Sequence, residues 1–204
     1  RDLGGSVDLA LDGRARLDTS LVEAEISGQT RDVTIDQPEA DRLLRGVTEI
    51  ALRLSKLQSQ IDLPELLVSN PQITLEGSAG IAPQNSTVDV RIDMPNLSEV
   101  VPSMSGPASV VLDAVEDATG WTIDLDATGA GARVIADGRV TDLNADDTSP
   151  LAAGDLSLAV DEMSVFSELA RRELGGTVDL SAEGEARFDL SQASGTVEGT
   201  TRNL

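Results

Sequence analysis

The sequence of 204 residues contains no cysteine, no histidine and no tyrosine, and its aromatic residues are one tryptophan and two phenylalanines. Without cysteine, the chain has no disulfide, no thiolate nucleophile and no sulfur ligand for a metal. Without histidine, it lacks the commonest general base and the commonest metal ligand. No phosphate-binding loop, nucleophile elbow or catalytic triad appears in the sequence. We therefore predict a protein that is not an enzyme, with no catalytic residue, no bound metal and no cofactor.

Basic residues are also scarce, because 15 Lys and Arg stand against 36 Asp and Glu, for a net charge of -21. Nucleic-acid binding needs clustered basic residues and aromatic faces, and an anionic membrane surface repels such an acidic chain. No apolar run approaches the roughly 18 residues of a membrane-spanning helix. Apolar residues nevertheless make up 40% of the chain and follow a regular pattern, which predicts a folded chain and not a disordered one.

An internal repeat is the clearest long-range pattern. Residues Arg1–Asp18 (RDLGGSVDLALDGRARLD) align with Arg172–Asp189 (RELGGTVDLSAEGEARFD) at an offset of 171, and the match continues without a gap to Arg31 and Arg202. A weaker copy aligns DMPNLSEVVPSMSG, which starts at Asp93, with the segment 69 residues further on. A fixed repeat of this kind indicates a repetitive architecture. We expect the chain to be a slice of a longer array.

Each repeat unit is predicted to contain a short helix, then glycine, then an alternating strand. The segment from residue 39 to residue 57 is ambiguous, because its apolar spacing fits both a helix and a strand. We assign a helix to Pro38–Leu44 and a strand to Gly46–Lys56, since this division restores the order of the repeat. The chain is thus one segment, residues 1–204, with repeat boundaries near residues 37–46, 95–106 and 162–176.

Apolar and polar residues alternate strictly between these boundaries, as in Val7, Leu9 and Leu11, and Trp121 falls in phase with Ile123. A period of two indicates a half-buried strand with one apolar face. We expect about a dozen such strands, mostly antiparallel. A sheet of this size must hide its apolar face, and the choices are a two-sheet sandwich, a closed barrel or an elongated sheet folded into a trough.

The inward-facing residues allow two interpretations. Alternating aliphatic residues usually pack as an ordinary core. Here the inward set includes many alanines and few aromatic residues, which normally supply much of the volume of a core. The second interpretation is therefore a hydrophobic groove that side chains fill incompletely. The predicted groove-lining residues are Val7, Leu9, Leu11, Ile73, Leu75, Val90, Ile92, Leu112, Ile123, Leu125, Leu158, Val178 and Leu180.

Three motifs give the chain a family resemblance: Leu-Gly-Gly-x-Val-Asp-Leu after a short helix, DxPxLxxVxPxxxG at Asp93–Gly106, and ITLEGSAGI at Ile73–Ile81. With the array of alternating strands, these motifs resemble the AsmA-like family that includes TamB. The resemblance is one of sequence style and extends over essentially the whole chain. Its motifs are degenerate. It implies a β-taco, which is an open trough made from an elongated, mostly antiparallel all-β sheet with short linker helices and a hydrophobic inner groove. The family has no catalytic residues.

The same resemblance implies a non-enzymatic conduit or scaffold in the periplasm, anchored in the inner membrane through a segment outside this chain. It implies a role in a translocation and assembly module for outer-membrane biogenesis. That role would be phospholipid transport between membranes, or the assembly of outer-membrane and autotransporter proteins during secretion. The implied partners are phospholipid acyl chains or unfolded outer-membrane protein strands, and a TamA-like outer-membrane barrel contacted by the full-length protein.

A different class of protein stays open as the alternative. It is a solid β-sandwich repeat module of an extracellular adhesin or surface protein, stabilised by calcium. The acidic pairs Glu116–Asp117 and Asp146–Asp147 are its candidate calcium ligands, although solvated loop charge explains them more simply. The two hypotheses differ in the apolar face, which is filled in a sandwich and open in a trough.

Overall fold

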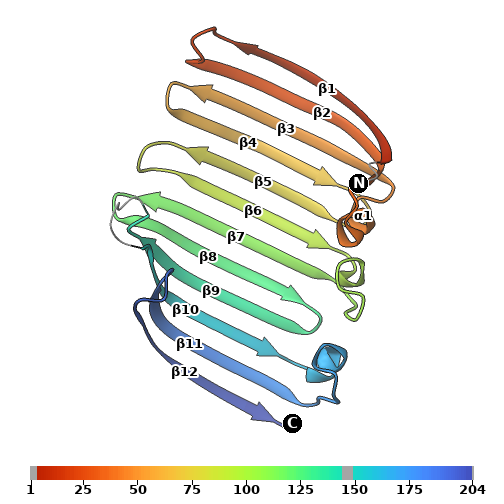
Figure 1. Ribbon diagram of the computed structural model, residues 1–204, viewed down its shortest axis with the longest axis vertical. Helices are drawn as coiled ribbons and strands as arrows, with labels where there is room; N and C mark the ends of the chain where they lie inside the picture. Colours follow the sequence, from red (N-terminus) through yellow and green to blue (C-terminus); the bar gives the residue numbers. More distant parts are fainter. Residues whose placement is uncertain (1–3, 144–148, 204) are drawn as a thin grey trace.

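The computed structural model describes residues 4–143 and 149–203, which form a single sheet of twelve strands. The strands follow one another across the sheet in sequence order, and each pair of neighbours is antiparallel. Figure 1 shows the result as a long meander with β1 at one end and β12 at the other. The predicted all-β fold, an elongated antiparallel sheet with short linker helices, is confirmed. The sheet stays open.

The strands are eight to fourteen residues long. They are β1 (Gly4–Ala15), β2 (Leu21–Thr34), β3 (Val47–Leu57), β4 (Gln60–Ser69), β5 (Thr74–Ile81), β6 (Thr87–Met94), β7 (Ala108–Asp117), β8 (Gly120–Gly129), β9 (Ala132–Thr141), β10 (Leu151–Val160), β11 (Thr177–Arg187) and β12 (Ala193–Arg202). The helical elements are α1 (Pro38–Leu43), the 3-10 helices η1 (Leu97–Glu99) and η2 (Met163–Phe166), and α2 (Ser167–Ala170).

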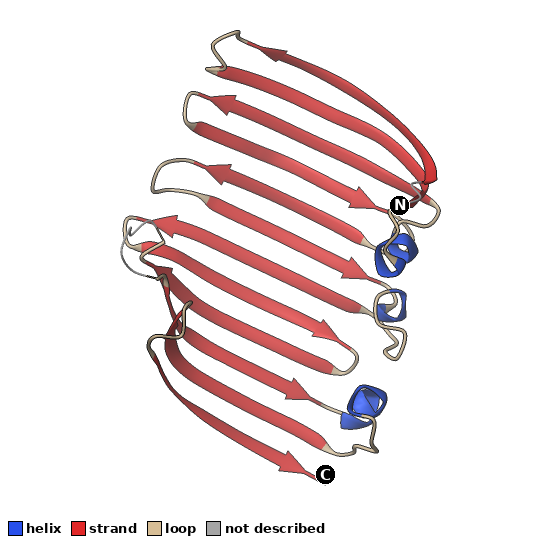
Figure 2. Cartoon of the chain, in the orientation of Figure 1, coloured by secondary structure: helices blue, strands red, loops and turns tan. Residues whose placement is uncertain are grey.

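The helical linkers recur at every fourth strand, after β2, β6 and β10. Figure 2 shows all of them along the same side of the sheet, where these strands end. They fall within residues 37–46, 95–106 and 162–176, and α1 and β3 agree with the predicted helix and strand to within one residue at each end. Proline begins α1, a position at which its missing N–H breaks no helical hydrogen bond. Longer linkers thus alternate with tight turns along this side.

The sequence repeat is also a structural repeat. In the first hairpin, Leu9 of β1 lies opposite Gly28 of β2. In the last hairpin, Leu180 of β11 lies opposite Gly199 of β12. Both members of the second pair are displaced from the first by the offset of 171, so the two hairpins have the same register. The aligned sequences therefore form equivalent hairpins at opposite ends of the sheet.

The register sorts the side chains onto two faces, because residues directly opposite one another in an antiparallel pair point to the same side. One row crosses all twelve strands through aliphatic residues and one glycine. It consists of Leu11, Ile26, Leu52, Leu66, Gly77, Val90, Leu112, Leu125, Ala136, Leu156, Ala182 and Val197. We call the side of the sheet that carries this row the apolar face, and the other side the polar face.

The linkers close one end of the apolar face. Asn70, in the turn after β4, donates from Nδ2 to the carbonyl oxygen of Leu43 at 2.7 Å and to Oγ1 of Thr48 at 2.9 Å, which ties α1 to β3. Thr48 is fully buried as a result. Further along, Leu97 of η1 packs over Gly129 of β8. The helices therefore act as caps at the strand ends and leave the middle of the face uncovered.

The described residues form no solid core. Their buried hydrophobic side chains are three alanines and one valine, namely Ala108, Ala114, Ala130 and Val160. A two-sheet sandwich would bury the alternating aliphatic residues of both sheets between its layers. Residues 4–143 and 149–203 make one sheet, so the solid sandwich that the adhesin alternative requires is not formed within them.

Candidate hydrophobic groove

Nearly all the predicted groove-lining residues lie on the apolar face. Several of them are direct neighbours across the sheet: Leu75 opposes Ile92, and Leu112 opposes both Val90 and Leu125. The remainder are spread from the first strand to the eleventh: Val7, Leu9 and Leu11 on β1, Ile123 on β8, Leu158 on β10, and Val178 and Leu180 on β11. The structure therefore places them along the length of one face and not around one compact pocket.

Ile73 is the one predicted residue that lies outside the strands. It precedes β5, in a turn where its N–H donates to Oδ1 of Asn70 at 2.9 Å and its carbonyl accepts from the N–H of Asn70 at 2.9 Å. The sequence ITL extends the alternating pattern by one residue beyond the strand, which explains the prediction. A turn closed by an asparagine side chain interrupts the ladder at this position. Ile73 thus lies in the turn between β4 and β5 that Asn70 connects to α1.

Large aliphatic side chains on the apolar face remain in contact with solvent. Leu11 is 73% exposed on β1, Leu156 is 45% exposed on β10 and Val197 is 75% exposed on β12. The outermost strands are the most exposed because each has a neighbour on one side only. Contiguous exposed apolar surface is unusual on a folded chain and marks an interaction site. This face is therefore the candidate functional site.

The apolar face carries a broad, open hollow over β7 to β12, the strands drawn from green to blue in Figure 1. The hollow has a volume of about 840 Å³. Its walls include the predicted residues Leu112, Ile123 and Leu125, together with Leu156 and Val197. Alanines contribute to the lining as well, including Ala136, Ala152, Ala182, Ala186 and Ala193, and charged residues such as Asp137, Arg139 and Glu183 lie at its borders. An aliphatic wall with a small-residue floor suits a flexible apolar ligand.

Four glycines make up part of that floor, and the sequence analysis did not identify them as a set. Gly138, Gly154, Gly184 and Gly195 come from β9 to β12 and oppose one another in a continuous row. A Cβ atom on Gly154 would lie 2.2 Å from the carbonyl oxygen of Asp137 and 2.6 Å from the Cα atom of Gly138. Neighbouring backbones therefore approach too closely for a side chain at this point. The row is visible only once the register is known.

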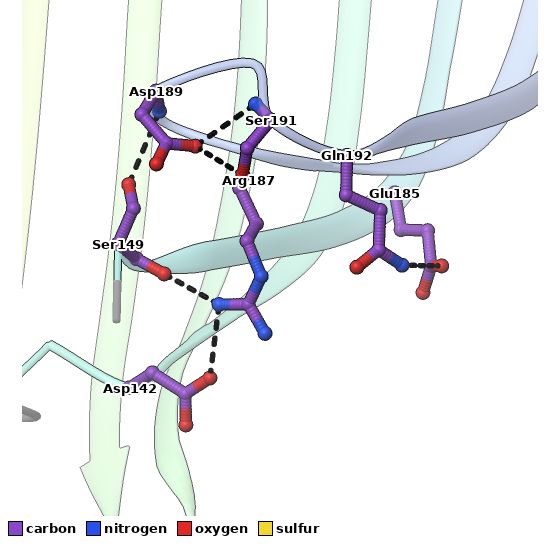
Figure 3. Close-up of polar contacts among 7 residues, drawn as sticks. All are labelled: Asp142, Ser149, Glu185, Arg187, Asp189, Ser191 and Gln192. Atoms are coloured by element: carbon purple, nitrogen blue, oxygen red, sulfur yellow. Dashed lines mark hydrogen bonds and ion pairs between the residues drawn. The ribbon is translucent and has the colours of Figure 1, made fainter. Parts of the chain in front are cut away.

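A network of polar contacts joins the loops at the strand ends opposite the linkers, as Figure 3 shows. Arg187 donates to the carbonyl oxygen of Ser149 at 2.6 Å and to Oδ2 of Asp142 at 3.4 Å. The N–H of Asp189 donates to Oγ of Ser149 at 3.1 Å, while Oδ1 of Asp189 accepts from Ser191. The turn between β11 and β12 is thereby fixed to the segment that leads into β10.

The polar face carries an uninterrupted row of carboxylates over six neighbouring strands, β6 to β11. Its members are Asp89, Asp113, Asp124, Asp137, Asp155 and Glu183. Like charges directly opposite one another destabilise a strand pair. The pKa of Asp113 is raised above its ordinary value, first by a hydrogen bond with the Asp89 carboxyl and then by partial desolvation and the neighbouring charges. The apolar hollow thus lies behind a strongly acidic outer surface.

Other carboxylates on this surface have arginine partners. Asp126 accepts two hydrogen bonds from Arg133, at 2.7 and 3.1 Å, and Asp117 pairs with Arg139. These hydrogen bonds lower the pKa of both aspartates. Glu116, the other member of the acidic pair, accepts from Oγ of Ser86 at 2.6 Å. The pair proposed as calcium ligands is therefore engaged by protein donors.

We expect the acidic row to limit stability near neutral pH. The raised pKa of Asp113 means that the folded state binds more protons than the unfolded state just above the ordinary value of 3.8. The contribution of this group to the free energy of unfolding falls as the pH rises through that interval. Asp117 and Asp126, with lowered pKa values, act in the opposite sense, because their stabilisation is lost as the pH falls below the ordinary value. The melting temperature should therefore rise as the pH is lowered from 7 into the interval just above 3.8, and fall at lower pH.

Removing one charge from the row tests this expectation. Asp124→Asn, in the middle of the row, should raise the melting temperature at pH 7 and reduce the rise seen on acidification. The gain should shrink in about 1 M salt, where the screening length is roughly 3 Å. Asp179→Asn is the control, because Asp179 opposes Ala159 and Thr200 and has no carboxylate directly across from it. Equal effects of the two substitutions, measured by thermal unfolding, would contradict the expectation.

Among residues 4–143 and 149–203, no group of three or more Asp and Glu residues is arranged to hold a metal ion. Asp146 and Asp147 lie outside the described residues. No helix in the described ranges is long and apolar enough to cross a membrane. Comparison with protein-family models, with curated proteins and with solved structures gave no match.

Proposed function

We propose that the apolar face binds the acyl chains of phospholipids, and that the chain is a non-enzymatic hydrophobic conduit. One observation carries the proposal: aliphatic residues and glycine form a row across all twelve strands, and no second layer covers that row within the described residues. At a spacing of about 4.8 Å per strand, the row is roughly 50 Å long. It therefore exceeds the length of one acyl chain.

The binding energy that such a face offers suits the movement of a lipid along it and not tight binding at one position. Each methylene group that leaves water contributes about 0.8 kcal/mol, independently of where along the face it lies. Aliphatic side chains offer no hydrogen bond that would hold a lipid at one position. An acyl chain on this face would be retained and still be free to move along it. The acidic polar face would keep the exposed apolar surface from associating with other acidic chains.

The same proposal includes a cellular location and a partner for the protein. We infer a TamB-like periplasmic protein in outer-membrane biogenesis, part of a translocation and assembly module, with a TamA-like barrel as its outer-membrane partner. The motifs at Asp93–Gly106 and Ile73–Ile81, together with the open sheet, support this assignment. Phospholipid transport between the membranes is the role that best suits the apolar face.

Strand binding is the second candidate function, and a separate observation favours it. β1 and β12 are the outermost strands of the described sheet, and each has one neighbour within it. An extended segment of an unfolded outer-membrane protein could be held there by β-augmentation. Edge binding needs main-chain hydrogen bonds, whereas acyl-chain binding needs the apolar face.

Site-specific photocrosslinking of protein purified from cells tests acyl-chain binding. A crosslinker at Leu75 on the apolar face should capture lipid, and native mass spectrometry should find adducts of acyl-lipid mass. The neighbouring Glu76 points to the polar face of the same strand, opposite Leu67 and Arg91, and provides the control. Adducts at Leu75 without adducts at Glu76 would support the proposal. Absence of adducts at Leu75, or equal yields at both positions, would contradict it.

A further inference from the structure

The single lysine of the sequence, Lys56, lies near the end of β3, and the strand pairing places it on the apolar face. It is directly opposite Val22 of β2 and Ile61 of β4, and facing residues of an antiparallel pair point to the same side. The arginines of the strands, from Arg14 on β1 to Arg202 on β12, all have register positions on the polar face. A cation on the apolar face is therefore a departure from the pattern of the whole sheet.

One other charged side chain falls on the apolar face among the residues paired in the strand ladders. It is Glu116 of β7, which opposes Trp121 of β8. Its carboxylate accepts from Oγ of Ser86 at 2.6 Å, and its N–H donates to the carbonyl oxygen of Ser86 at 2.7 Å. No carboxylate among residues 4–143 and 149–203 lies within ion-pairing distance of the Lys56 ammonium. The uncompensated charge on this face is thus positive.

An aliphatic surface of sufficient length adjoins Lys56. β3 starts after α1 and runs away from it, so Lys56 lies at the side of the sheet opposite the linkers (Figure 1). Leu54, Leu52 and Ile50 follow on the same face toward the linker, where Thr48 is buried. At roughly 3.4 Å per residue, the distance from Lys56 to Thr48 is about 27 Å. The hydrocarbon layer of one bilayer leaflet is about 15 Å thick, so an acyl chain fits within this length.

We propose that Lys56 binds the phosphate group of a phospholipid whose acyl chains lie on the apolar face. The proposal rests on the proposed acyl-chain binding, and it adds the chemistry of the headgroup and the orientation of the lipid. A lysine ammonium has three donors and pairs with phosphate oxygens as a point charge. Its aliphatic stem can lie along apolar surface while the charge stays at the border of that surface. Charge complementarity thus selects a phospholipid over an uncharged lipid.

Free phosphate does not suit the same position. The chain has a net charge of -21, which repels small anions at long range. A single solvent-exposed ionic contact contributes little to affinity by itself. A phospholipid gains in addition from the removal of its methylene groups from water along Leu54, Leu52 and Ile50. The phosphate should therefore be bound only when it is attached to acyl chains.

Two lipids that differ in the phosphate test the headgroup contact. Dioctanoyl phosphatidic acid and dioctanoylglycerol are each used to displace a fluorescent phosphatidylethanolamine from the intact chain. Phosphatidic acid should bind roughly three- to tenfold more tightly. Lys56→Gln should abolish this difference and leave the affinity for dioctanoylglycerol within about twofold, whereas Lys56→Arg should preserve the difference. Displacement of the fluorescent lipid by inorganic phosphate at the same concentrations would overturn the proposal.

Arg53→Gln is the matched control. Arg53 lies on the same strand as Lys56 but on the polar face, where it pairs with Glu25 at 3.7 Å and Glu65 at 3.4 Å. Both substitutions remove one positive charge, so the two variants have the same net charge. Arg53→Gln should leave the preference for phosphatidic acid intact. Equal loss of the preference in both variants would mean that it arises from net charge and not from Lys56.

The orientation of the lipid is tested by two photoreactive phospholipids, one labelled on the headgroup and one at the end of an acyl chain. Mass spectrometry of proteolytic fragments should find the headgroup label near Ile61 and the chain-end label nearer the linkers, around Ile50. The reverse distribution would overturn the proposed orientation.

Failure of the headgroup contact and failure of acyl-chain binding give different results. Equal affinities of the starting protein for phosphatidic acid and dioctanoylglycerol would overturn the role of Lys56 and leave acyl-chain binding standing. If neither lipid displaces the fluorescent phosphatidylethanolamine, acyl-chain binding itself is contradicted, and the headgroup contact with it.

Discussion

Leu156→Glu is expected to reduce binding of a fluorescent phosphatidylethanolamine by roughly 10- to 100-fold. Leu156 lies in the aliphatic row and lines the hollow over β7 to β12. Full burial of a leucine side chain by a ligand contributes about 1.5–3 kcal/mol, and every 1.4 kcal/mol corresponds to a factor of ten in affinity. A carboxylate at this point would also have to be desolvated by the passing acyl chain, which adds to the loss. The lipid is zwitterionic, so a general repulsion between charges does not explain the effect.

Ser157→Glu is the matched control for this experiment. Ser157 adjoins Leu156 on β10 but points to the polar face, opposite Ile135 and Ser181. Both substitutions add one negative charge to the same strand at exposed positions, so they differ only in the face that receives the charge. Ser157→Glu should leave lipid affinity within about twofold of the starting protein. Equal losses from the two variants would mean that the apolar face is not the binding surface.

Gly154→Ala is expected to destabilise the fold by about 1–3 kcal/mol, the usual cost of forcing an extra methyl group into a tightly packed position. The added Cβ atom would meet the backbone of β9, which has no rotamer to change, and the strands would have to separate. For a chain of this size, the melting temperature should fall by roughly 2–12 °C. Because the glycine row lies at the floor of the hollow, the substitution should also widen the spacing of β9 and β10 locally.

Gly175→Ala provides the comparison, since the only neighbour within 4 Å of its added Cβ atom is the carbonyl oxygen of Asn203, at an ordinary 3.7 Å. This variant should melt within about 2 °C of the starting protein, or slightly higher, because alanine restricts the unfolded chain more than glycine does. Thermal unfolding followed by circular dichroism measures both. Similar melting temperatures for the two variants would show that the strands near Gly154 have room for a side chain.

Most of the sheet could be predicted from the amino-acid sequence because the relevant signals are local. The alternation around Val90, Ile92 and Leu125 indicates strands with one apolar face whatever lies next to them. The repeat at an offset of 171 located equivalent hairpins, and the positions of the linker segments were also predicted. Ile73 precedes β5 for a local reason too, because the side chain of Asn70 closes a turn where the hydrophobic pattern continues.

The alternation of apolar and polar residues could not decide whether the apolar face is covered by a second layer or left open. A sandwich, a barrel and an open sheet all require the same period of two, since each strand has one apolar and one polar side in all three. The scarcity of aromatic residues favoured an incompletely filled face but could not exclude a thin core. The structure resolves the choice for the described residues, where a single sheet leaves Leu156 and its row uncovered.

The amino-acid pattern thus sufficed for the strands, the linkers, the two faces and the repeat, which all depend on residues close in the chain or on direct identity between segments. Pairing between strands decided the remaining features. The six carboxylates from Asp89 to Glu183 and the four glycines from Gly138 to Gly195 are scattered through the sequence, and only the register places them in rows. A shift of one residue in any ladder would move each of these side chains to the opposite face. The hollow and its acidic outer surface are therefore properties of the assembled sheet.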